Sequence, residues 1–129
     1  CVIRLKKAVI GVVEGDTHDI GKNLVKIMME TAGFEMYDLG RDVPLDQFIE
    51  KAKEVDADLI CMSTLMTTTM GGMQTVIEKL KDQGIRDKFK VMVGGSPISK
   101  KFADDIGAEG YSVNAVEAVK VAKELTGIA

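Results

Sequence analysis

The chain has 129 residues, which suffice for one hydrophobic core and are too few for two ordinary domains. Its 20 acidic and 17 basic side chains leave a formal charge of -3, which argues against a nucleic-acid or anionic-membrane partner. No stretch approaches the roughly 20 consecutive apolar residues of a membrane span, and two isolated cysteines, Cys1 and Cys61, indicate a reduced, cytoplasmic protein.

Five short apolar segments alternate with longer amphipathic stretches. This alternation predicts strand–helix units wound around a parallel sheet. The first, third and fourth segments are almost entirely apolar, as expected for central strands that are covered on both faces. The predicted strands are residues 8–13, 35–38, 59–63, 90–93 and 110–112.

Turn and capping residues divide the intervening stretches into five helices. Gly33 ends the first helix, because glycine readily takes the left-handed conformation of a helix end. Pro44 opens the second helix, the third ends near Gly84, and Asn114 caps the fifth. We expect the first helix at residues 20–32, the fourth at 99–106 and the fifth at 115–125.

These units predict an α/β fold, a single doubly wound, flavodoxin-like sheet with strand order 2-1-3-4-5 and helices on both faces. Ligands of such open sheets bind beyond the carboxyl ends of the strands, near the point where the strand order reverses. In this chain those ends lead into residues 14–21, 64–70 and 94–97. The sequence therefore predicts a site built from these three loops.

His18 is the only histidine of the chain and lies in the first of these loops. A lone histidine is often a packed structural side chain. Asp16, two residues earlier, can reach one ring nitrogen and leave the other pointing outward, as a metal-binding histidine requires. A zinc site needs three or four protein ligands, whereas a metal held by a macrocycle needs only an axial one. The residues alone leave the structural and the axial-ligand roles of His18 open.

A short motif lies at the beginning of each of the three loops or at the strand end that leads into it. The motifs are DxHxxG at Asp16, His18 and Gly21, SxL at Ser63 and Leu65, and a glycine pair at Gly94 and Gly95. In order and spacing they resemble the three-part signature of cobalamin-binding domains, and the resemblance covers nearly the whole chain. The segments at 14–23 and 67–70 are similar to the corrinoid proteins of methylamine and methanol methyltransferase systems and to the cobalamin module of methionine synthase.

The resemblance implies that cobalamin binds in a base-off, histidine-on mode. Its benzimidazole tail leaves the cobalt, His18 replaces the tail, and the tail enters a slot beside the sheet. Gly94 and Gly95 would leave that slot unfilled, although a glycine pair alone is more often an ordinary turn. The residues expected to bind the cofactor are Asp16, Thr17, His18, Asp19, Ile20, Gly21, Ser63, Leu65, Thr67, Thr69, Gly94 and Gly95, with His18 as the metal ligand.

The resemblance further implies a relay behind the ligand. In the family a hydroxyl residue six positions after the SxL serine continues a hydrogen-bond chain from the histidine through the aspartate. Counting from Ser63 leads to Thr69, so the expected relay is His18, Asp16 and Thr69, with Thr67 or Thr68 as alternatives for the last member.

By the same resemblance the chain is a corrinoid carrier that shuttles a methyl group between a substrate:corrinoid methyltransferase and a second, methyl-accepting methyltransferase. We do not expect turnover from residues 1–129 alone, since no nucleophile–base pair is evident. Family members carry a helical cap domain before this one. Because the chain begins at Cys1 and soon enters a core strand, we expect that domain upstream.

Three other functions are compatible with parts of the pattern. A cobalamin-dependent mutase module shares the fold and the histidine motif, but the segments at 14–23 and 67–70 favour the methyltransferase type. A corrinoid-binding sensor or storage protein would use the same site. A receiver or nucleotide-binding domain of flavodoxin type would have no use for His18.

Overall fold

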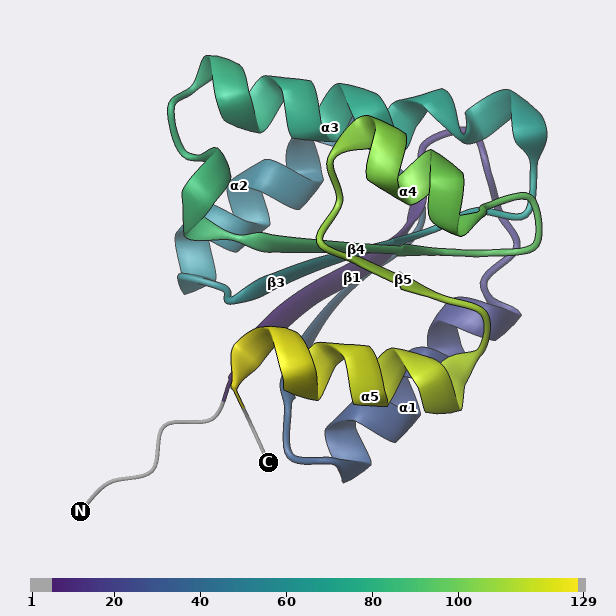
Figure 1. Ribbon diagram of the computed structural model, residues 1–129, viewed down its shortest axis with the longest axis vertical. Coiled ribbons are helices and arrows are strands. Elements are labelled where there is room, and N and C mark those ends of the chain that lie inside the picture. Colours follow the sequence, from purple (N-terminus) through teal and green to yellow (C-terminus); the bar gives the residue numbers. More distant parts are fainter. Residues whose placement is uncertain (1–5, 128–129) are drawn as a thin grey trace.

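A five-stranded parallel sheet runs through the centre of the structure (Figure 1). The computed structural model describes residues 6–127, so Cys1 lies outside the described residues. The strand order is β2-β1-β3-β4-β5, as predicted. The strands are β1 (Lys7–Val13), β2 (Glu35–Val43), β3 (Leu59–Ser63), β4 (Lys90–Gly94) and β5 (Gly110–Ser112).

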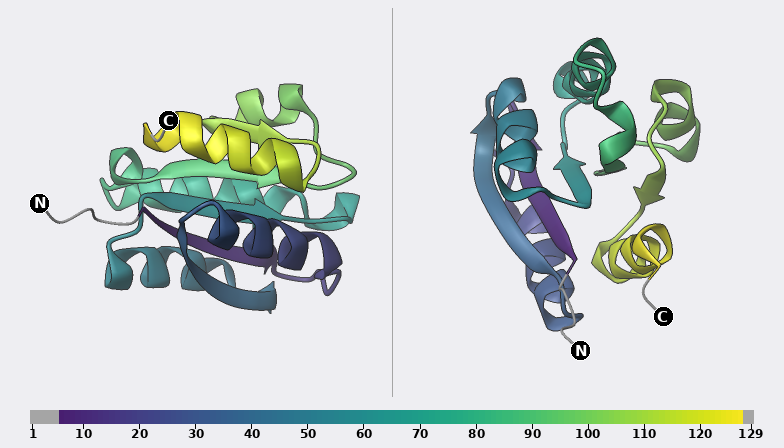
Figure 2. Two further views of the ribbon diagram at one scale, coloured as in Figure 1. Left: turned by 90° about the horizontal axis from the view of Figure 1, so that it is seen from below. Right: turned by 90° about the vertical axis from the view of Figure 1, so that its left-hand side faces the viewer.

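Helices cover both faces of the sheet (Figure 1, Figure 2). One face carries α1 and α5, and the other carries α2, α3 and α4. None of the described helices is long and apolar enough to cross a membrane. The helices are α1 (Ile20–Thr31), α2 (Leu45–Val55), α3 (Gly71–Asp82), α4 (Lys100–Ile106) and α5 (Ala115–Thr126), with 3-10 turns at Thr67–Thr69 and Arg86–Lys88.

The core consists of two hydrophobic clusters, one on each face of the sheet, because successive strand residues point to opposite sides. On β1, Val9 and Val13 join the larger cluster beneath α2, α3 and α4, whereas Ala8 and Ile10 join the smaller one beneath α1 and α5. The smaller cluster leaves a cleft at the carboxyl end of the sheet between α1 and α5, which is described below.

Most predicted boundaries agree with the structure within one or two residues, and Asn114 caps α5 as expected, its Oδ1 accepting a hydrogen bond from the Glu117 amide at 2.8 Å. Pro44 is the residue before α2 rather than its first helical residue, because its ψ of 135° is extended. Gly33 has the predicted left-handed conformation, with φ of 101°.

Strand β2 is the main exception to the predicted boundaries. It runs to Val43, five residues beyond the predicted end, and follows β1 through two register shifts. Gly40 and Asp42 both have positive φ, of 93° and 50°, within this stretch. The segment from Asp38 to Asp42 has the composition of a turn, but the two irregularities let it stay paired with β1.

Candidate functional site

The three loops that follow β1, β3 and β4 meet at the carboxyl edge of the sheet, as predicted. Asp16 in the first loop accepts hydrogen bonds from Thr64 and Leu65 in the second. The Thr64 amide in turn donates to the carbonyl of Gly94 at 3.2 Å. This joins all three loops by hydrogen bonds near His18.

Asp16 is the centre of this arrangement. Its side chain is fully buried, and its two carboxylate oxygens accept four hydrogen bonds. Oδ1 accepts from the His18 amide at 2.8 Å and from His18 Nδ1 at 2.6 Å. Oδ2 accepts from Thr64 Oγ1 at 2.6 Å and from the Leu65 amide at 2.7 Å. One short side chain therefore connects the histidine to the loop after β3.

These hydrogen bonds keep Asp16 ionised. Burial alone would raise the pKa of its carboxyl, but the bonds from Thr64, from the amides of His18 and Leu65 and from the His18 ring lower that pKa well below the usual range. A carboxylate can only accept, so the proton of the 2.6 Å bond belongs to His18 Nδ1. That tautomer leaves the lone pair on Nε2, and the ring is 56% exposed.

The imidazole is thus prepared to bind a metal through one nitrogen. Within residues 6–127 no three side chains of His, Cys, Asp and Glu gather in a way that could hold an ion by themselves. The arrangement suits a metal that arrives with its other ligands and needs one axial nitrogen.

Thr64 is a site residue that sequence reasoning missed. It is fully buried, and its hydroxyl is the one that donates to Asp16. Thr69, the predicted third member of the relay, lies behind Thr64 as seen from Asp16. Its hydroxyl contacts the Thr64 hydroxyl and donates to the Met66 carbonyl. Thr67 and Thr68 are exposed. The predicted order is corrected to His18, Asp16, Thr64 and then Thr69.

The glycine pair borders the cleft and also has a packing role that the sequence did not predict. Gly95 has φ of 128°, and a Cβ there would lie 1.8 Å from the Thr64 carbonyl oxygen. A Cβ at Gly94 would lie 3.2 Å from the Ser112 carbonyl. At both positions the backbone of a neighbouring segment lies where a Cβ would be or directly beside it. Gly95 in particular allows Thr64 to reach the position from which it holds Asp16.

Gly21 differs from that pair, since a Cβ there would meet no atom within 4 Å. It lies in the first turn of α1 and borders the cleft, so its missing side chain leaves open space beside the histidine loop. Ile20 is 86% exposed and Leu65 is 45% exposed, and both are apolar. Thr17 is exposed and Asp19 is partly buried on the same loop.

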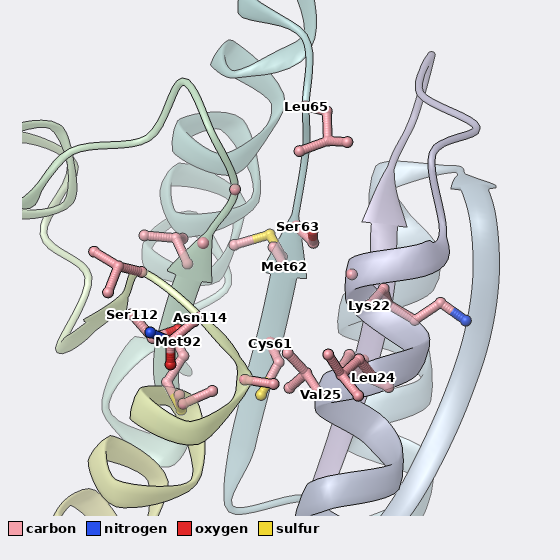
Figure 3. A pocket seen from close by; sticks show the side chains of 18 of the residues that line it. Lys22, Leu24, Val25, Cys61, Met62, Ser63, Leu65, Met92, Ser112 and Asn114 are labelled. Atoms are coloured by element: carbon pink, nitrogen blue, oxygen red, sulfur yellow. The ribbon is translucent and has the colours of Figure 1, made fainter.

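A cleft of about 280 Å³ opens between α1 and α5 over the ends of β3 and β4 (Figure 3). Its floor is mainly apolar and includes Cys61 and Met92, while Ser63, Ser112 and Asn114 add polar groups. Burial raises the pKa of the Cys61 thiol to about 12, so that thiol stays protonated. Of the predicted residues, the cleft is lined by Gly21, Ser63, Leu65, Gly94 and Gly95.

Several other lining residues were not predicted, among them Leu24, Val25, Met92, Ser112 and Asn114. Leu24, Val25 and Met92 have the apolar character of core positions, and Asn114 has the place of a helix cap, so sequence periodicity does not single these residues out as a site.

The cleft between α1 and α5 and the exposed His18 imidazole both lie at the carboxyl end of the sheet, an arrangement that could receive a tailed macrocyclic cofactor. A family model of the B12 binding domain matches residues 6–120. The chain belongs to this family. Cobalamin is accordingly the cofactor of this B12-binding domain. The residues present fit it, because the His18 imidazole could supply a single nitrogen ligand and the cleft has a largely apolar floor.

The B12-binding domain is also similar to individual proteins of known name. It is 61% identical over 115 residues to dimethylamine corrinoid protein 3 of Methanosarcina mazei, covering 89% of this chain and 69% of that protein. The monomethylamine corrinoid protein of Methanosarcina barkeri superposes with a TM-score of 0.90 at 41% identity, over 93% of this chain and 57% of that one.

A third match is the methanol:cobalamin methyltransferase complex MtaBC from Methanosarcina barkeri, with a TM-score of 0.86 and 33% identity, over 94% of this chain and 46% of that one. The B12-binding domain thus spans between 46% and 69% of the length of these three chains.

Proposed function

We propose that this chain is a corrinoid carrier that binds cobalamin with His18 as the axial cobalt ligand and shuttles a methyl group between a substrate:corrinoid methyltransferase and a second methyltransferase. One observation carries the proposal: His18 donates through Nδ1 to the buried Asp16 carboxylate and so presents Nε2 next to the cleft-bearing edge of the sheet. When bound, cobalamin supplies the cobalt centre to which the methyl group is attached.

The cleft between α1 and α5 is the proposed slot for the benzimidazole tail. Burying roughly 200 Å² of that ring contributes on the order of 5 kcal/mol before the tail is immobilised, which offsets the loss of its own cobalt bond. Ser63, Ser112 and Asn114 offer polar groups to the tail, and Gly21 leaves room for it at the start of α1. The exposed apolar Ile20 and Leu65 are proposed to lie against the corrin.

Asp16 has a positioning role in this proposal. It keeps the proton on Nδ1, fixes the orientation of the ring and strengthens Nε2 as a ligand. Thr64 and the Leu65 amide hold the carboxylate from the other side, so the histidine is connected to the sheet through β3. The order of groups is His18, Asp16, Thr64 and Thr69.

The proposed partners follow from the named relatives. Those are corrinoid proteins of dimethylamine and monomethylamine and a methanol:cobalamin methyltransferase complex, which supports a methyl-donor methyltransferase and a methyl-acceptor methyltransferase as partners. We further propose a helical cap domain that covers the upper corrin face, and we expect no turnover by this domain alone. A cytoplasmic location is also part of the proposal, because the free Cys61 thiol stays reduced there.

The test is a titration of the apoprotein with hydroxocobalamin, followed by the visible spectrum. We expect tight binding and a histidine-coordinated spectrum for the parent chain, and weaker binding with a changed spectrum for His18→Ala. Glu14→Ala is the matched control, because Glu14 is exposed on the same loop and is not among the residues expected to bind the cofactor, and its spectrum should equal that of the parent. A parent that binds no corrinoid, or identical spectra for the parent and His18→Ala, would overturn the proposal.

A further inference from the structure

The loop that carries His18 is held on its second side by strand β2, an edge strand with no part in the sequence motifs. Asp42, near the end of β2, makes two hydrogen bonds to this loop. Its Oδ1 accepts from the Gly15 amide at 2.8 Å, and its own amide donates to the Asp16 carbonyl at 2.8 Å. Asp42 therefore holds the backbone of Gly15 and of Asp16, shortly before His18.

The conformation of β2 at this point is unusual in a way that serves these contacts. Asp42 has φ of 50°, one of two positive values among the described non-glycine residues. Such a conformation costs free energy and persists where surrounding contacts hold it in place. Gly40, with φ of 93°, lies two residues earlier and donates its amide to Asp38 Oδ1 at 2.8 Å. The two register shifts between β1 and β2 occur in the same stretch, between Ile10 and Val13 of β1.

The same strand also holds the far end of the loop. Lys22, in the first turn of α1, donates to both carboxylate oxygens of Asp38 at 2.8 Å, and its ammonium points away from the cleft (Figure 3). Residues 14–21 thus extend between two attachment points on β2, with Asp42 at the beginning and Asp38 at the end. The loop can shift relative to the sheet only if one of these attachments breaks.

We infer that Asp42 is a positioning residue for the cobalt ligand. It fixes the backbone of Gly15 and Asp16, and the Asp16 carboxylate then fixes the amide and the ring of His18. Thr64 determines where the carboxylate lies, and Asp42 determines where the backbone lies, so the imidazole is defined from two strands on either side of β1. This inference rests on the proposed function of His18 and assigns to Asp42 the part of pre-organising it.

Two substitutions distinguish the contribution of the Asp42 carboxylate from that of the Asp42 backbone amide. Asp42→Gly keeps the positive φ and the amide that donates to Asp16, and it removes only the acceptor for Gly15. Asp42→Asn keeps an acceptor oxygen at the same place. Glu14→Ala is the matched control, because Glu14 is an exposed carboxylate of the same loop that accepts from the Leu45 amide at 3.2 Å instead.

Two measurements test the inference, hydrogen exchange of the apoprotein and titration with hydroxocobalamin. In Asp42→Gly we expect amide exchange within residues 14–19 to accelerate about tenfold, with the rest of the sheet unchanged, and corrinoid affinity to fall about three- to tenfold with a smaller histidine-coordinated fraction in the spectrum. Asp42→Asn and Glu14→Ala should match the parent in both measurements.

The outcomes distinguish the two proposals. The role of Asp42 is overturned if the parent binds hydroxocobalamin and the Asp42→Gly variant has the same amide exchange and the same spectrum. That result leaves the role of His18 intact. Exchange that accelerates throughout the sheet, or a variant Asp42→Asn as impaired as Asp42→Gly, also overturns it, because the role requires a local effect of the acceptor oxygen. A parent that binds no corrinoid removes the proposed function, whatever the exchange shows.

Discussion

The ammonium of Lys22 lies 2.8 Å from both carboxylate oxygens of Asp38, and the two side chains differ sharply in exposure. The Lys22 side chain is 2% exposed, whereas that of Asp38 is 22% exposed. Lys22 also donates to Asn23 Oδ1, so its charge is balanced entirely by protein groups. Asp38 in addition receives the Gly40 amide and lies 3.7 Å from Lys26. The two partners therefore depend on this pair to different degrees.

The difference predicts unequal costs of breaking the pair. Asp38→Asn leaves a buried ammonium without its counter-charge and should lower the free energy of unfolding by about 2–4 kcal/mol. Lys22→Met leaves a carboxylate that water and Lys26 still reach, and should cost about 1–2 kcal/mol. Urea unfolding of both variants and of the double variant measures this. Equal costs would show that the exposure of Asp38 does not matter.

The same pair predicts a loss of stability in acid. Burial raises the pKa of Asp38. The hydrogen bonds from Lys22 and the Gly40 amide and the charges of Lys22 and Lys26 together lower it by more than burial raises it, so the folded pKa lies below the ordinary value of 3.8. Protons then bind the unfolded chain more readily, so this stabilisation is complete above the unfolded pKa and disappears as the pH falls through the lower, folded one.

Unfolding in urea between pH 6 and pH 2 checks this expectation. The free energy of unfolding should decline below about pH 4, and less steeply in Asp38→Asn, where the titrating group is gone. Asp16 acts in the same direction, since its pKa is also lowered, so some decline should remain in the variant. An unchanged slope in Asp38→Asn would contradict the assignment.

Thr64 is predicted to matter more than Thr69 for the histidine site. Thr64→Val removes the only side-chain hydroxyl within residues 6–127 that donates to Asp16, and Oδ2 of the buried carboxylate then accepts from the Leu65 amide alone. We expect a loss of about 1–3 kcal/mol in stability and a weaker histidine-coordinated spectrum with hydroxocobalamin. Thr69→Val removes a hydroxyl one step further away and should have the smaller effect on both. The reverse ranking would restore the order predicted from sequence.

The overall fold could be predicted from the sequence because the short apolar segments at 8–13, 59–63 and 90–93 alternate with longer amphipathic stretches, a pattern typical of central strands in a parallel sheet. Once they are parallel, their carboxyl ends meet at one edge, which places His18, Ser63 and Gly94 near each other. The contact of Asp16 with His18 was also predictable, since the two are separated by a single residue.

The rest depends on contacts that no local pattern reveals. Thr64 lies 48 positions from Asp16. Three further threonines follow within five residues of Thr64, so the sequence does not indicate which threonine contacts Asp16. The extension of β2 through Gly40 and Asp42 was missed because glycine and aspartate in succession favour a turn, whereas pairing with β1 continues across two irregularities. Backbone geometry at bulges is decided by tertiary contacts, so Asp42 could be recognised only in the structure.

Gly95 is predicted to tolerate no side chain. In Gly95→Ala the new Cβ would meet the Thr64 carbonyl at 1.8 Å, at a φ of 128° that alanine rarely adopts. We expect a loss of about 3 kcal/mol or more in the free energy of unfolding, with weakened corrinoid binding through displacement of Thr64. Gly94→Ala meets the Ser112 carbonyl at 3.2 Å and should cost less. Thermal unfolding of the two variants measures the difference, and similar melting temperatures would contradict it.

Gly21 should separate stability from cofactor binding. It lies in α1 without positive φ, and a Cβ there meets no protein atom within 4 Å, so Gly21→Ala should stabilise the apoprotein by about 0.5 kcal/mol through helix propensity. The same methyl group projects into the region beside the cleft that we assign to cobalamin, and should weaken hydroxocobalamin binding by about tenfold. Thermal unfolding and corrinoid titration of one variant give both values. If the Gly21→Ala protein is more stable and binds hydroxocobalamin as tightly as the parent, the cofactor does not lie at the start of α1. The added methyl group can weaken binding only if the cofactor occupies the space beside Gly21.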